Sequence, residues 1–431
     1  MGRDERLVPE VLFGAYRSNA QIDRDRIIYS PHLARLAEVT QVRSLDGFLV
    51  HNRLTHSLKV AQLARRLAES VRKNQPELAT RLGVDPDVAE AAGLAHDMGH
   101  PPFGHIAEEE LDDLVRKHGV ADGYEGNAQT FRILVSLSVG DTQPTDKAIP
   151  FLPGLNLTKA TLNAVLKYPW LHPDQPSGLK KWGAYQTEKE AFAWARADAT
   201  ATKRSAEAEI MDWADDITYA IHDMIDFHCA GLIPLHLLRP VSVDGQLKPL
   251  NAREESTVFD SFLRRRKLKT AEVEDYKAAF RQALNMTNAS HPYEGTLEES
   301  RDLWAFMSVL IGNYMDAFML ADPHTIADGR CAEIKELAKK QTTILKELTW
   351  RYVILHNDLA TIQHGQRKAI QVLFEVFVDA INREQYQLLP KNFAELIKAS
   401  KDVPSARWAA DYISGLTERD LSKLHHRLTS C

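Results

Sequence analysis

Four residues of the chain carry side chains that could share a metal ion: His56 in HNRLTHS, the adjacent His96 and Asp97 in GLAHDMGHPPFGH, and Asp215 in DWADDITYAIHD. Imidazole nitrogens and carboxylate oxygens form a mixed donor set, which suits manganese, magnesium, iron, cobalt or nickel better than a thiolate-rich zinc site. A cation that prefers six ligands keeps positions open for water and a phosphate oxygen. The residue types therefore predict one divalent metal ion per site, held by these four side chains.

A second group of residues could move a proton. His105 and Glu108 are three residues apart, just after the Pro101-Pro102 pair, where a new helix would begin. A glutamate that holds one ring nitrogen of a histidine leaves the other nitrogen to deliver or accept a proton near neutral pH. His100 lies in the same loop and is expected to reach toward phosphate groups.

One helix is predicted to present a row of polar side chains. Asp215, Tyr219 and Asp223 are spaced by four residues, so they line one face of a helix. Asp216 lies off that row, which favours Asp215 as the metal ligand and leaves Asp216 as a supporting or solvated charge. We call the predicted ligands His56, His96, Asp97 and Asp215 the metal group. Arg53 stands three residues before His56, and therefore on the same helix face.

The elements that must position these residues are helices. Apolar residues between positions 54 and 68 recur at steps of three and four, which indicates an amphipathic helix. A second helix is predicted over 88–97, ended by Gly99 and the Pro101-Pro102 pair, and a third over 205–229. The metal ligands would then come from three helices, so that the metal also ties the core together.

The whole chain is predicted to be all-α, apart from a small β-hairpin. In VSVDGQLKPL, Asp244-Gly245 supplies the residues that a two-residue hairpin turn prefers. Pro- and Gly-bearing loops are expected at 140–154 and 169–183. Further helices are expected at 127–139, 156–168, 187–200, 254–285, 297–321, 330–356, 366–383, 390–400, 405–415 and 417–428.

No linker rich in proline, glycine or serine divides the chain. We therefore expect a single large helical domain over residues 1–431. The chemistry is expected within 41–230, and 231–431 would add helices that complete the pocket or form an oligomer interface.

Composition narrows the class of protein. The chain has 431 residues and a formal net charge of -6, so any binding of a polyanion must rely on locally gathered positive charge. Cys229, Cys331 and Cys431 are odd in number and widely separated, which argues against a disulfide framework. The first residues lack the apolar stretch of a signal peptide, and no window is apolar enough to span a bilayer. A cytoplasmic protein without a membrane partner is expected.

The order H…HD…D resembles the HD phosphohydrolase superfamily, and the flanking sequence resembles its deoxyguanosinetriphosphate triphosphohydrolase-like family. The resemblance spans roughly the first half of the chain in the family's order, with a weaker echo in LATIQHGQRKAIQVLFEVF at 359–377. The motifs are DRDRIIYS at 23–30, RLAEVTQV at 35–42, HNRLTHS at 51–57, AHDMGHPPFGH at 95–105, YEGNAQTFR at 124–132, LNLTKATLNAVLKYPW at 155–170 and IMDWADDITYAIHD at 210–223.

The resemblance implies an HD-domain helical core that splits a deoxynucleoside triphosphate (dNTP) such as dGTP into deoxynucleoside and tripolyphosphate. It implies that Arg53 clamps phosphate, and that His105 and Glu108 form the acid/base dyad. It further implies that Tyr219 and Asp223 contact the sugar. Gln41 matches the family position that hydrogen-bonds the 3′-hydroxyl.

Several alternatives stay open. Another HD reaction, such as that of a nucleotide 5′-monophosphatase or a cyclic-nucleotide phosphodiesterase, is the nearest rival activity. A protein that binds dNTPs or single-stranded DNA without hydrolysis is the rival of a different class. The family also implies a homo-oligomer, for which a hexamer is plausible, and an allosteric dNTP. Lys167 and the Lys180-Lys181 pair could face phosphates or lie exposed in loops.

Overall fold

α-Helices make up most of this computed structural model, which describes residues 2–10, 16–41, 52–140, 154–197, 203–266, 270–324, 329–355, 358–400 and 402–429. Within these ranges the β-structure consists of two small two-stranded antiparallel sheets and a few isolated bridges. The predicted all-α fold class is confirmed. In the described segments, no helix has a stretch that is both long and apolar enough to cross a bilayer.

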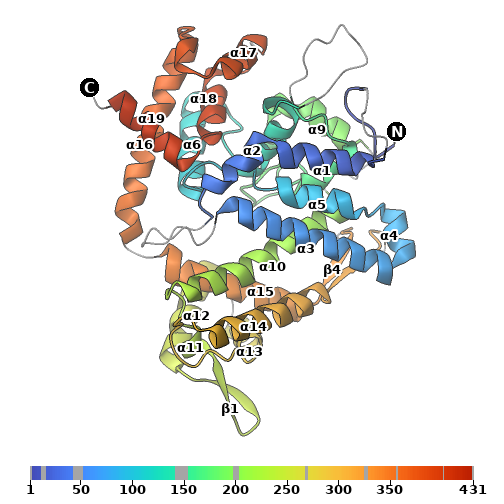
Figure 1. Ribbon diagram of the computed structural model, residues 1–431, viewed down its shortest axis with the longest axis vertical. Coiled ribbons are helices and arrows are strands. Elements are labelled where there is room, and N and C mark those ends of the chain that lie inside the picture. Colours follow the sequence, from blue (N-terminus) through green and yellow to red (C-terminus); the bar gives the residue numbers. More distant parts are fainter. Residues whose placement is uncertain are drawn as a thin grey trace.

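The N-terminal part of the chain, coloured blue to green in Figure 1, supplies helices α1 to α10. Short 3-10 or π turns carry the label η. The elements are α1 (Asn19–Tyr29), α2 (Pro31–Ala34), η1 (Arg35–Glu38), α3 (Arg53–Asn74), α4 (Pro76–Leu82), α5 (Pro86–Ala95), α6 (His105–Lys117), α7 (Gly126–Arg132), η2 (Ile133–Leu137), α8 (Lys159–Val165), η3 (His172–Asp174), η4 (Gln186–Glu188), α9 (Lys189–Ala195) and α10 (Ala206–Cys229).

The C-terminal part forms both ends of the elongated molecule in Figure 1, with α12–α15 at the lower end and α16–α19 at the upper end. Its elements are α11 (Leu235–Leu238), β1 (Pro240–Val243), β2 (Gln246–Pro249), α12 (Ala252–Arg266), α13 (Thr270–Leu284), α14 (Leu297–Met315), β3 (Phe318–Leu320), β4 (Ala332–Ile334), α15 (Glu336–Thr349), η5 (Trp350–Ile354), α16 (Asp358–Asn382), η6 (Tyr386–Leu388), α17 (Lys391–Ala399), α18 (Ser405–Ser414) and α19 (Glu418–Thr429).

Helices α3, α5 and α10 form the central layer. A side chain at Gly93 of α5 would place its Cβ only 2.7 Å from the Cα of Ala61 in α3, so glycine permits the two helix backbones to lie unusually close. Helix α10 begins after Ser205, whose side chain accepts a hydrogen bond from the backbone N–H of Ala208. It packs on both α3 and α5, and on α15 from its other side (Figure 1).

Two hydrophobic clusters fill the interior, and each joins N-terminal to C-terminal helices. The first extends from the N-terminal helices into α16 and α18 and includes Ile27, Leu94, Phe131, Phe374 and Ile413. The second joins α3 and α10 to α12–α15 and includes Leu67, Ile217, Phe259, Leu310 and Leu345. Both clusters would lose much of their apolar burial if the C-terminal helices were removed.

Buried ion pairs add a second connection between the two parts of the chain. Arg132 of α7 is held by Asp411 of α18 at 2.7 Å and also by Glu188, and all three side chains are buried. Arg407 of α18 reaches Asp122 at 2.9 Å. Because an unpaired buried charge is costly, these pairs fix how α18 lies against the N-terminal helices.

Several predicted helices differ in extent from the helices of the structure. The helix expected over 254–285 is divided into α12 and α13, which pack against each other and against α15. The helix expected over 297–321 ends at Met315, and Phe318–Leu320 instead forms β3, which pairs with β4 at 332–334. Local periodicity does not reveal such long-range pairing. Helix α15 consequently begins only at Glu336, within the helix expected over 330–356.

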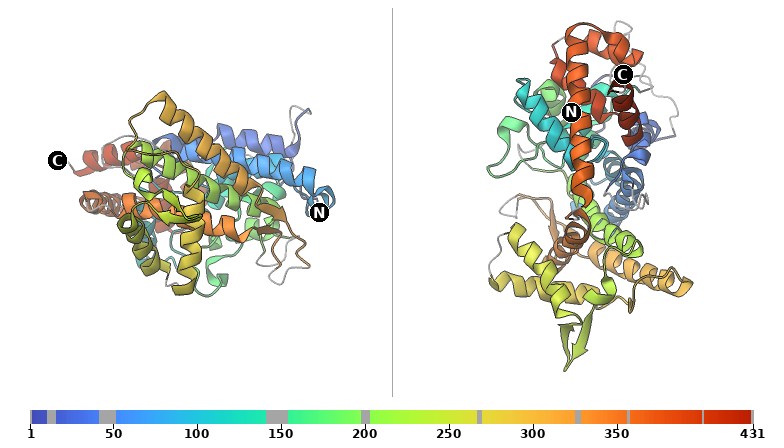
Figure 2. Two further views of the ribbon diagram at one scale, coloured as in Figure 1. Left: turned by 90° about the horizontal axis from the view of Figure 1, so that it is seen from below. Right: turned by 90° about the vertical axis from the view of Figure 1, so that its left-hand side faces the viewer.

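The predicted hairpin is confirmed. Strands β1 and β2 pair in antiparallel register from Pro240 with Pro249 to Val243 with Gln246. Asp244 and Gly245 both have positive φ angles, 52° and 74°, as a two-residue type I′ turn requires. The hairpin projects from the lower end of the molecule in Figure 1, and Figure 2 shows α16 running upright along one side.

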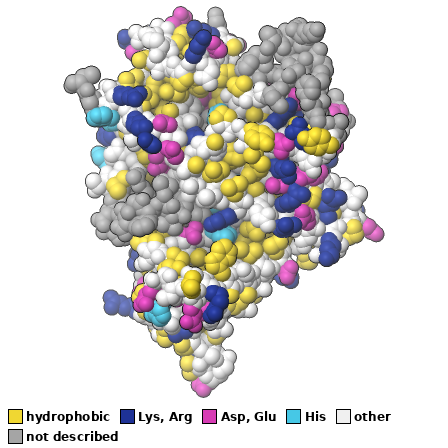
Figure 3. Space-filling model, in the orientation of Figure 1, with side chains coloured by type: hydrophobic (Ala, Val, Ile, Leu, Met, Phe, Trp, Pro, Cys, Tyr) yellow, Lys and Arg dark blue, Asp and Glu magenta, His cyan; other side chains and the backbone are white. Residues whose placement is uncertain are grey.

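Charges on the visible surface are mixed. On the face drawn in Figure 3, Lys and Arg side chains are interspersed with Asp and Glu, in keeping with the net charge of -6. Cys229 and Cys331 are free thiols. The third cysteine, Cys431, lies outside the described residues, as does most of the loop expected over 140–154.

Candidate metal centre and active site

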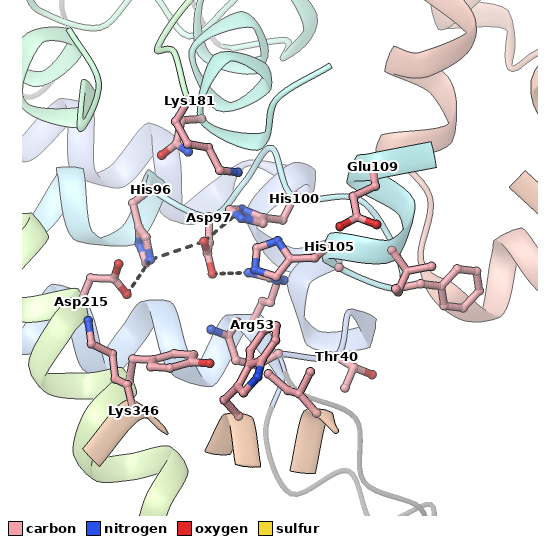
Figure 4. A pocket seen from close by; sticks show the side chains of 18 of the residues that line it. Thr40, Arg53, His96, Asp97, His100, His105, Glu109, Lys181, Asp215 and Lys346 are labelled. Carbon is pink, nitrogen blue, oxygen red and sulfur yellow. Dashed lines mark hydrogen bonds and ion pairs between the residues drawn. The ribbon is translucent and has the colours of Figure 1, made fainter. Parts of the chain in front are cut away.

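Three of the predicted ligands meet at one point. His56 lies in the first turn of α3, His96 directly follows α5, and Asp215 lies in α10. One ligand atom from each lies within 4.8 Å of the others, and in the described residues this is the group suited to holding a metal ion. Asp215 Oδ1 is 3.1 Å from His56 Nε2 and 3.7 Å from His96 Nε2. Figure 4 shows His96 and Asp215 pointing toward each other across the site.

The group fits a divalent cation. His96 Nδ1 lies 2.8 Å from the carbonyl oxygen of Gly93, which favours the tautomer that leaves the Nε2 lone pair facing the site. That Nε2 atom is buried and has no hydrogen-bond partner within the described residues. A buried ring nitrogen in this position, beside an imidazole and a carboxylate, is a donor set suited to the hard or borderline metals named above.

Asp97 lies beside the group rather than within it. Its Oδ1 is 3.5 Å from His96 Nε2, while its Oδ2 accepts a hydrogen bond of 2.7 Å from Arg53 (Figure 4). Burial alone would raise the pKa of Asp97, but His100 and Arg53 lower it far below its usual value. Asp97 is therefore a carboxylate next to the His/His/Asp group.

Asp215 is also held as a carboxylate. Burial opposes its ionisation, but the ammonium group of Lys167, 2.9 Å from Asp215 Oδ2, lowers the pKa of Asp215 well below its usual value. Lys167 also reaches Asp212 at 2.7 Å, and these two carboxylates raise its own pKa against the effect of burial. The loop lysine that the sequence left undecided thus lies at the site.

The loop that follows α5, residues 96–104, is held in place by α7 and by the segment before α7. A Cβ at Gly99 would lie 2.2 Å from the backbone nitrogen of Thr130, so only glycine permits this approach. Thr130 Oγ1 donates to the carbonyl oxygen of His96 and accepts from the Gly99 N–H at 2.9 Å. Tyr124 donates its hydroxyl to the Gly99 carbonyl at 2.7 Å. Sequence reasoning assigned no role to Thr130 or Tyr124.

His105 and Glu108 form a hydrogen-bonded pair at the start of α6. His105 Nδ1 donates to Glu108 Oε2 at 2.8 Å, and the His105 side chain is 70% exposed. Glu108 Oε1 accepts from Lys181 at 2.8 Å and from the Gly126 N–H at 2.9 Å. Burial would raise the pKa of Glu108, but the hydrogen bond from His105 and the charge of Lys181 lower it well below its usual value. The carboxylate is anchored, and the ring it holds faces solvent.

His100 is buried in the same loop. Burial, together with the positive charge of Arg53, lowers the pKa of His100 to about 3, so the ring is neutral at physiological pH. Its Nδ1 lies 3.1 Å from Asp97 Oδ1 (Figure 4).

A cavity of about 450 Å³ opens beside these groups. Gln41 and Tyr219 line it, whereas Asp223 is fully buried one turn further along α10 and lies outside the lining. The side-chain oxygen of Gln41 is buried without a hydrogen-bond partner among the described residues. Burial raises the pKa of Tyr219, so its hydroxyl keeps its proton. The four-residue spacing predicted that Asp215 and Tyr219 share one face of the helix, and both side chains do line the cavity.

The C-terminal helices complete the cavity, and sequence reasoning named none of these residues. Lys346 of α15 pairs with Asp216 at 2.5 Å, so Asp216 faces the cavity as one member of an ion pair. Trp350 carries the guanidinium of Arg265 3.8 Å above its ring centre. The C-terminal lining residues are Lys346, Trp350, Ile354, Ile362, Gln363, Gln366 and Glu418. Ile362, Gln363 and Gln366 fall in the weak echo at 359–377, whereas the other positions lie outside the motifs found in the sequence.

Comparisons with known proteins agree with this arrangement. Residues 53–140 match the HD domain family, and residues 332–427 match the phosphohydrolase-associated domain family. A deoxyguanosinetriphosphate triphosphohydrolase-like protein of Streptomyces coelicolor is 34% identical over 428 residues, covering 96% of this chain and 93% of the relative.

Two further relatives carry the same description. The relative in Corynebacterium efficiens is 33% identical, covering 95% of this chain and 90% of its own length. The relative in Wolinella succinogenes is 31% identical, with 96% of each chain covered. Together with the helical core and its His/His/Asp group, these matches place the chain in the deoxyguanosinetriphosphate triphosphohydrolase-like family of HD phosphohydrolases.

Proposed function

We propose that the protein hydrolyses dNTPs to deoxynucleoside and tripolyphosphate, with one divalent metal ion per site. The observation that carries the proposal is the convergence of His56, His96 and Asp215 beside a cavity of about 450 Å³, which His96 and Asp215 help to line. The relatives are deoxyguanosinetriphosphate triphosphohydrolase-like proteins, which supports a dNTP as the substrate. Asp97, 3.5 Å from His96, would join the three ligands.

The metal ion, manganese, magnesium, iron, cobalt or nickel, would supply Lewis-acid chemistry at a phosphoryl group. The chain's own cations would bind the triphosphate. Lys167, Lys181 and Lys346 all line the cavity, and each is paired with a carboxylate that a phosphate could replace as partner. Arg53 also lines it, and its planar fork suits phosphate oxygens.

The dyad would handle the proton. Glu108 holds the Nδ1–H of His105, so Nε2 is the atom that would protonate the departing 5′-oxygen or act as base in the reverse arrangement. The exposure of His105 allows the ring to exchange protons with solvent between turnovers. Neutral His100 would donate a hydrogen bond to a phosphate oxygen.

Other lining residues of the cavity would bind the nucleoside. Gln41 would hydrogen-bond the 3′-hydroxyl with the amide whose oxygen is otherwise unpartnered. Tyr219, supported by Asp223 on the same face of α10, would contact the sugar and crowd a ribose 2′-hydroxyl. Trp350, Ile354 and Ile362 form an apolar wall that suits a base.

The test is product analysis. Each dNTP, alone and in a mixture, is incubated with the protein and Mn²⁺ or Mg²⁺, and the products are separated by anion-exchange chromatography. Tripolyphosphate and deoxynucleoside in equal amounts support the proposal. Diphosphate or monophosphate products, or cleavage of nucleoside monophosphates or cyclic nucleotides instead, would support the alternative HD activities.

Binding of dNTPs or single-stranded DNA without hydrolysis would support the binding-protein alternative. Hydrolysis of one dNTP only in the mixture would reveal the expected allosteric dNTP. The homo-oligomer, with a hexamer as one arrangement, stays a prediction that sedimentation analysis tests.

A further inference from the structure

Glu418 lies near the C-terminus of the chain and yet lines the cavity. It is the first residue of α19, and its Oε1 accepts hydrogen bonds from two backbone N–H groups of the N-terminal part. The Thr40 nitrogen lies at 3.0 Å and the Phe103 nitrogen at 3.4 Å. One carboxylate oxygen therefore connects two segments that are far apart in the sequence.

Each of these segments carries a residue of the proposed site. Thr40 precedes Gln41, and a β-bridge between Thr40 and Asn52 joins this segment to the start of α3. Phe103 precedes Gly104 and His105, the first residue of α6. The Glu418 carboxylate thus sets the distance between the proposed 3′-hydroxyl reader and the proposed proton donor.

The backbone at Phe103 is strained and depends on neighbouring contacts. Phe103 has a φ angle of 69°, in the left-handed region that a bulky side chain rarely adopts, and Gly104 follows with a φ of 60°. A strained backbone of this kind persists only where its surroundings determine it, and it is typical of functional sites. The hydrogen bond from the Phe103 N–H to Glu418 is one of the contacts that determine it.

A second contact comes from the same C-terminal turn. Buried Arg35 donates to the carbonyl oxygen of Leu416 at 3.0 Å, and its other terminal nitrogen donates to the carbonyls of Met98 at 2.9 Å and His100 at 2.8 Å. The turn between α18 and α19 is thereby attached to the loop that follows the metal ligands. Glu418 is held against this loop from two directions.

We propose that Glu418 is a positioning residue that aligns Gln41 with His105 across the cavity, so that the C-terminal turn determines recognition of the sugar 3′-hydroxyl. The proposal rests on the proposed function, because the role of Gln41 in reading the sugar belongs to it. Glu418 is assigned no contact with the reacting atoms.

The decisive variant is Glu418→Asp. It keeps a negative charge at the N-terminus of α19, which the helix dipole favours, but withdraws the carboxylate by one methylene. We expect kcat/KM for a dNTP to fall roughly 10- to 100-fold, because small displacements of reacting groups are costly. Mn²⁺ affinity should not change, because the two hydrogen bonds of the Glu418 carboxylate go to Thr40 and Phe103 and not to His56, His96 or Asp215.

Substrate comparison separates positioning from a general loss of structure. A 2′,3′-dideoxynucleotide offers no 3′-hydroxyl for Gln41 to bind. The fall in kcat/KM caused by Glu418→Asp should therefore be about 10-fold smaller for the dideoxynucleotide than for the dNTP, which corresponds to one hydrogen bond. Gln41→Ala already removes the preference for a substrate with a 3′-hydroxyl. In this background, Glu418→Asp should no longer change the ratio of kcat/KM for the dNTP to kcat/KM for the dideoxynucleotide.

Asp420→Ala is the matched control. Asp420 is the other acidic residue in the first turn of α19, and its exposed carboxylate accepts a hydrogen bond from the hydroxyl of Thr417 at 2.9 Å. We expect it to leave the substrate ratio unchanged within about twofold, as for an exposed substitution. An unchanged ratio in Glu418→Asp, or an equal change in Asp420→Ala, would overturn the proposal.

Amide hydrogen exchange distinguishes failure of this proposal from failure of the proposed function. The Phe103 amide should exchange faster in Glu418→Asp than in the wild-type protein, whatever substrate the enzyme uses. If the wild-type protein hydrolyses no dNTP, the proposed function fails while this readout still decides whether Glu418 holds the loop. Unchanged exchange at Phe103 would overturn the positioning role itself.

Discussion

The N-terminal and C-terminal parts of the chain contribute to the cavity in different ways. The N-terminal part supplies the metal group and the His105–Glu108 pair, held by short motifs and close backbone contacts. The C-terminal part supplies a cation, an aromatic wall and a carboxylate that holds two backbone segments. The chemistry is thus concentrated in one part, while the shape of the site depends on both.

This difference teaches that the C-terminal helices help to form the cavity beside the candidate metal centre. Lys346 and Trp350 come from elements in the second hydrophobic cluster, and Glu418 comes from α19 beside the first. If the two parts differ in this way, substitutions at the N-terminal site residues should abolish hydrolysis. Substitutions in the C-terminal part should instead alter the stability of the fold, the binding of dNTPs and the selectivity between substrates.

The largest effect is expected at the metal group. Asp215→Asn removes the carboxylate that lies within 4 Å of both imidazoles, 3.1 Å from His56 and 3.7 Å from His96, and should abolish both metal binding and turnover. Isothermal titration with Mn²⁺ and a hydrolysis assay measure the two losses. Asp216→Asn is the matched control on the same helix and should keep the metal, since Asp216 pairs with Lys346. Full activity in Asp215→Asn would refute the ligand assignment.

The next effect is expected at the dyad. His105→Ala should bind Mn²⁺ as the wild-type protein does but lose rate by about 10²–10⁴, the usual contribution of an acid/base residue. The measurement is kcat at saturating substrate together with metal affinity. Loss of the metal in this variant would show that His105 supports the metal group instead of moving a proton.

Between the two parts, Asp411→Ala should destabilise the fold by about 3–5 kcal/mol, because it leaves Arg132 buried with one partner removed. Denaturant unfolding followed by circular dichroism measures the change. Asp379→Ala, which removes an exposed i,i+4 pair with Arg383 on α16, is the control and should cost less than about 1 kcal/mol. Equal effects would mean that α18 is not anchored by its buried ion pairs.

A smaller effect is expected from the C-terminal cation. Lys346→Ala should raise KM for a dNTP about 10-fold with little change in kcat, because a phosphate contact made in both ground and transition states is lost. Lys340→Ala on the same helix removes an exposed pair with Asp275 and should change neither constant. A fall in kcat alone would place Lys346 in the chemical step.

The sequence predicted the parts of the site that depend on residue identity. Two imidazoles and two carboxylates form a donor set suited to a metal ion, and they stand in motifs that resemble the family. Glu108 follows His105 by three residues, which puts the two on one helix face. Three of the four metal ligands come together as expected, and the helix that carries Asp215 and Tyr219 has almost the predicted bounds, Ala206–Cys229.

What the sequence could not predict depends on tertiary packing. Lys346 and Glu418 belong to ordinary amphipathic helices, and only the docking of α15 and α19 brings them to the cavity. The strand pair β3–β4 likewise needs a partner distant in sequence. The positions of Lys167 and Lys181 could not be predicted from local sequence patterns. In the structure, each lysine pairs with a carboxylate at the site.

The most direct test is to measure metal content against hydrolysis. Metal-stripped protein is titrated with Mn²⁺, and bound metal per chain and tripolyphosphate release from a dNTP mixture are followed together. We expect release to rise in proportion to occupancy and to saturate at one ion per chain, with neither signal in Asp215→Asn. Tripolyphosphate release by the metal-free protein, or full metal binding by Asp215→Asn, would contradict a metal centre built from His56, His96 and Asp215.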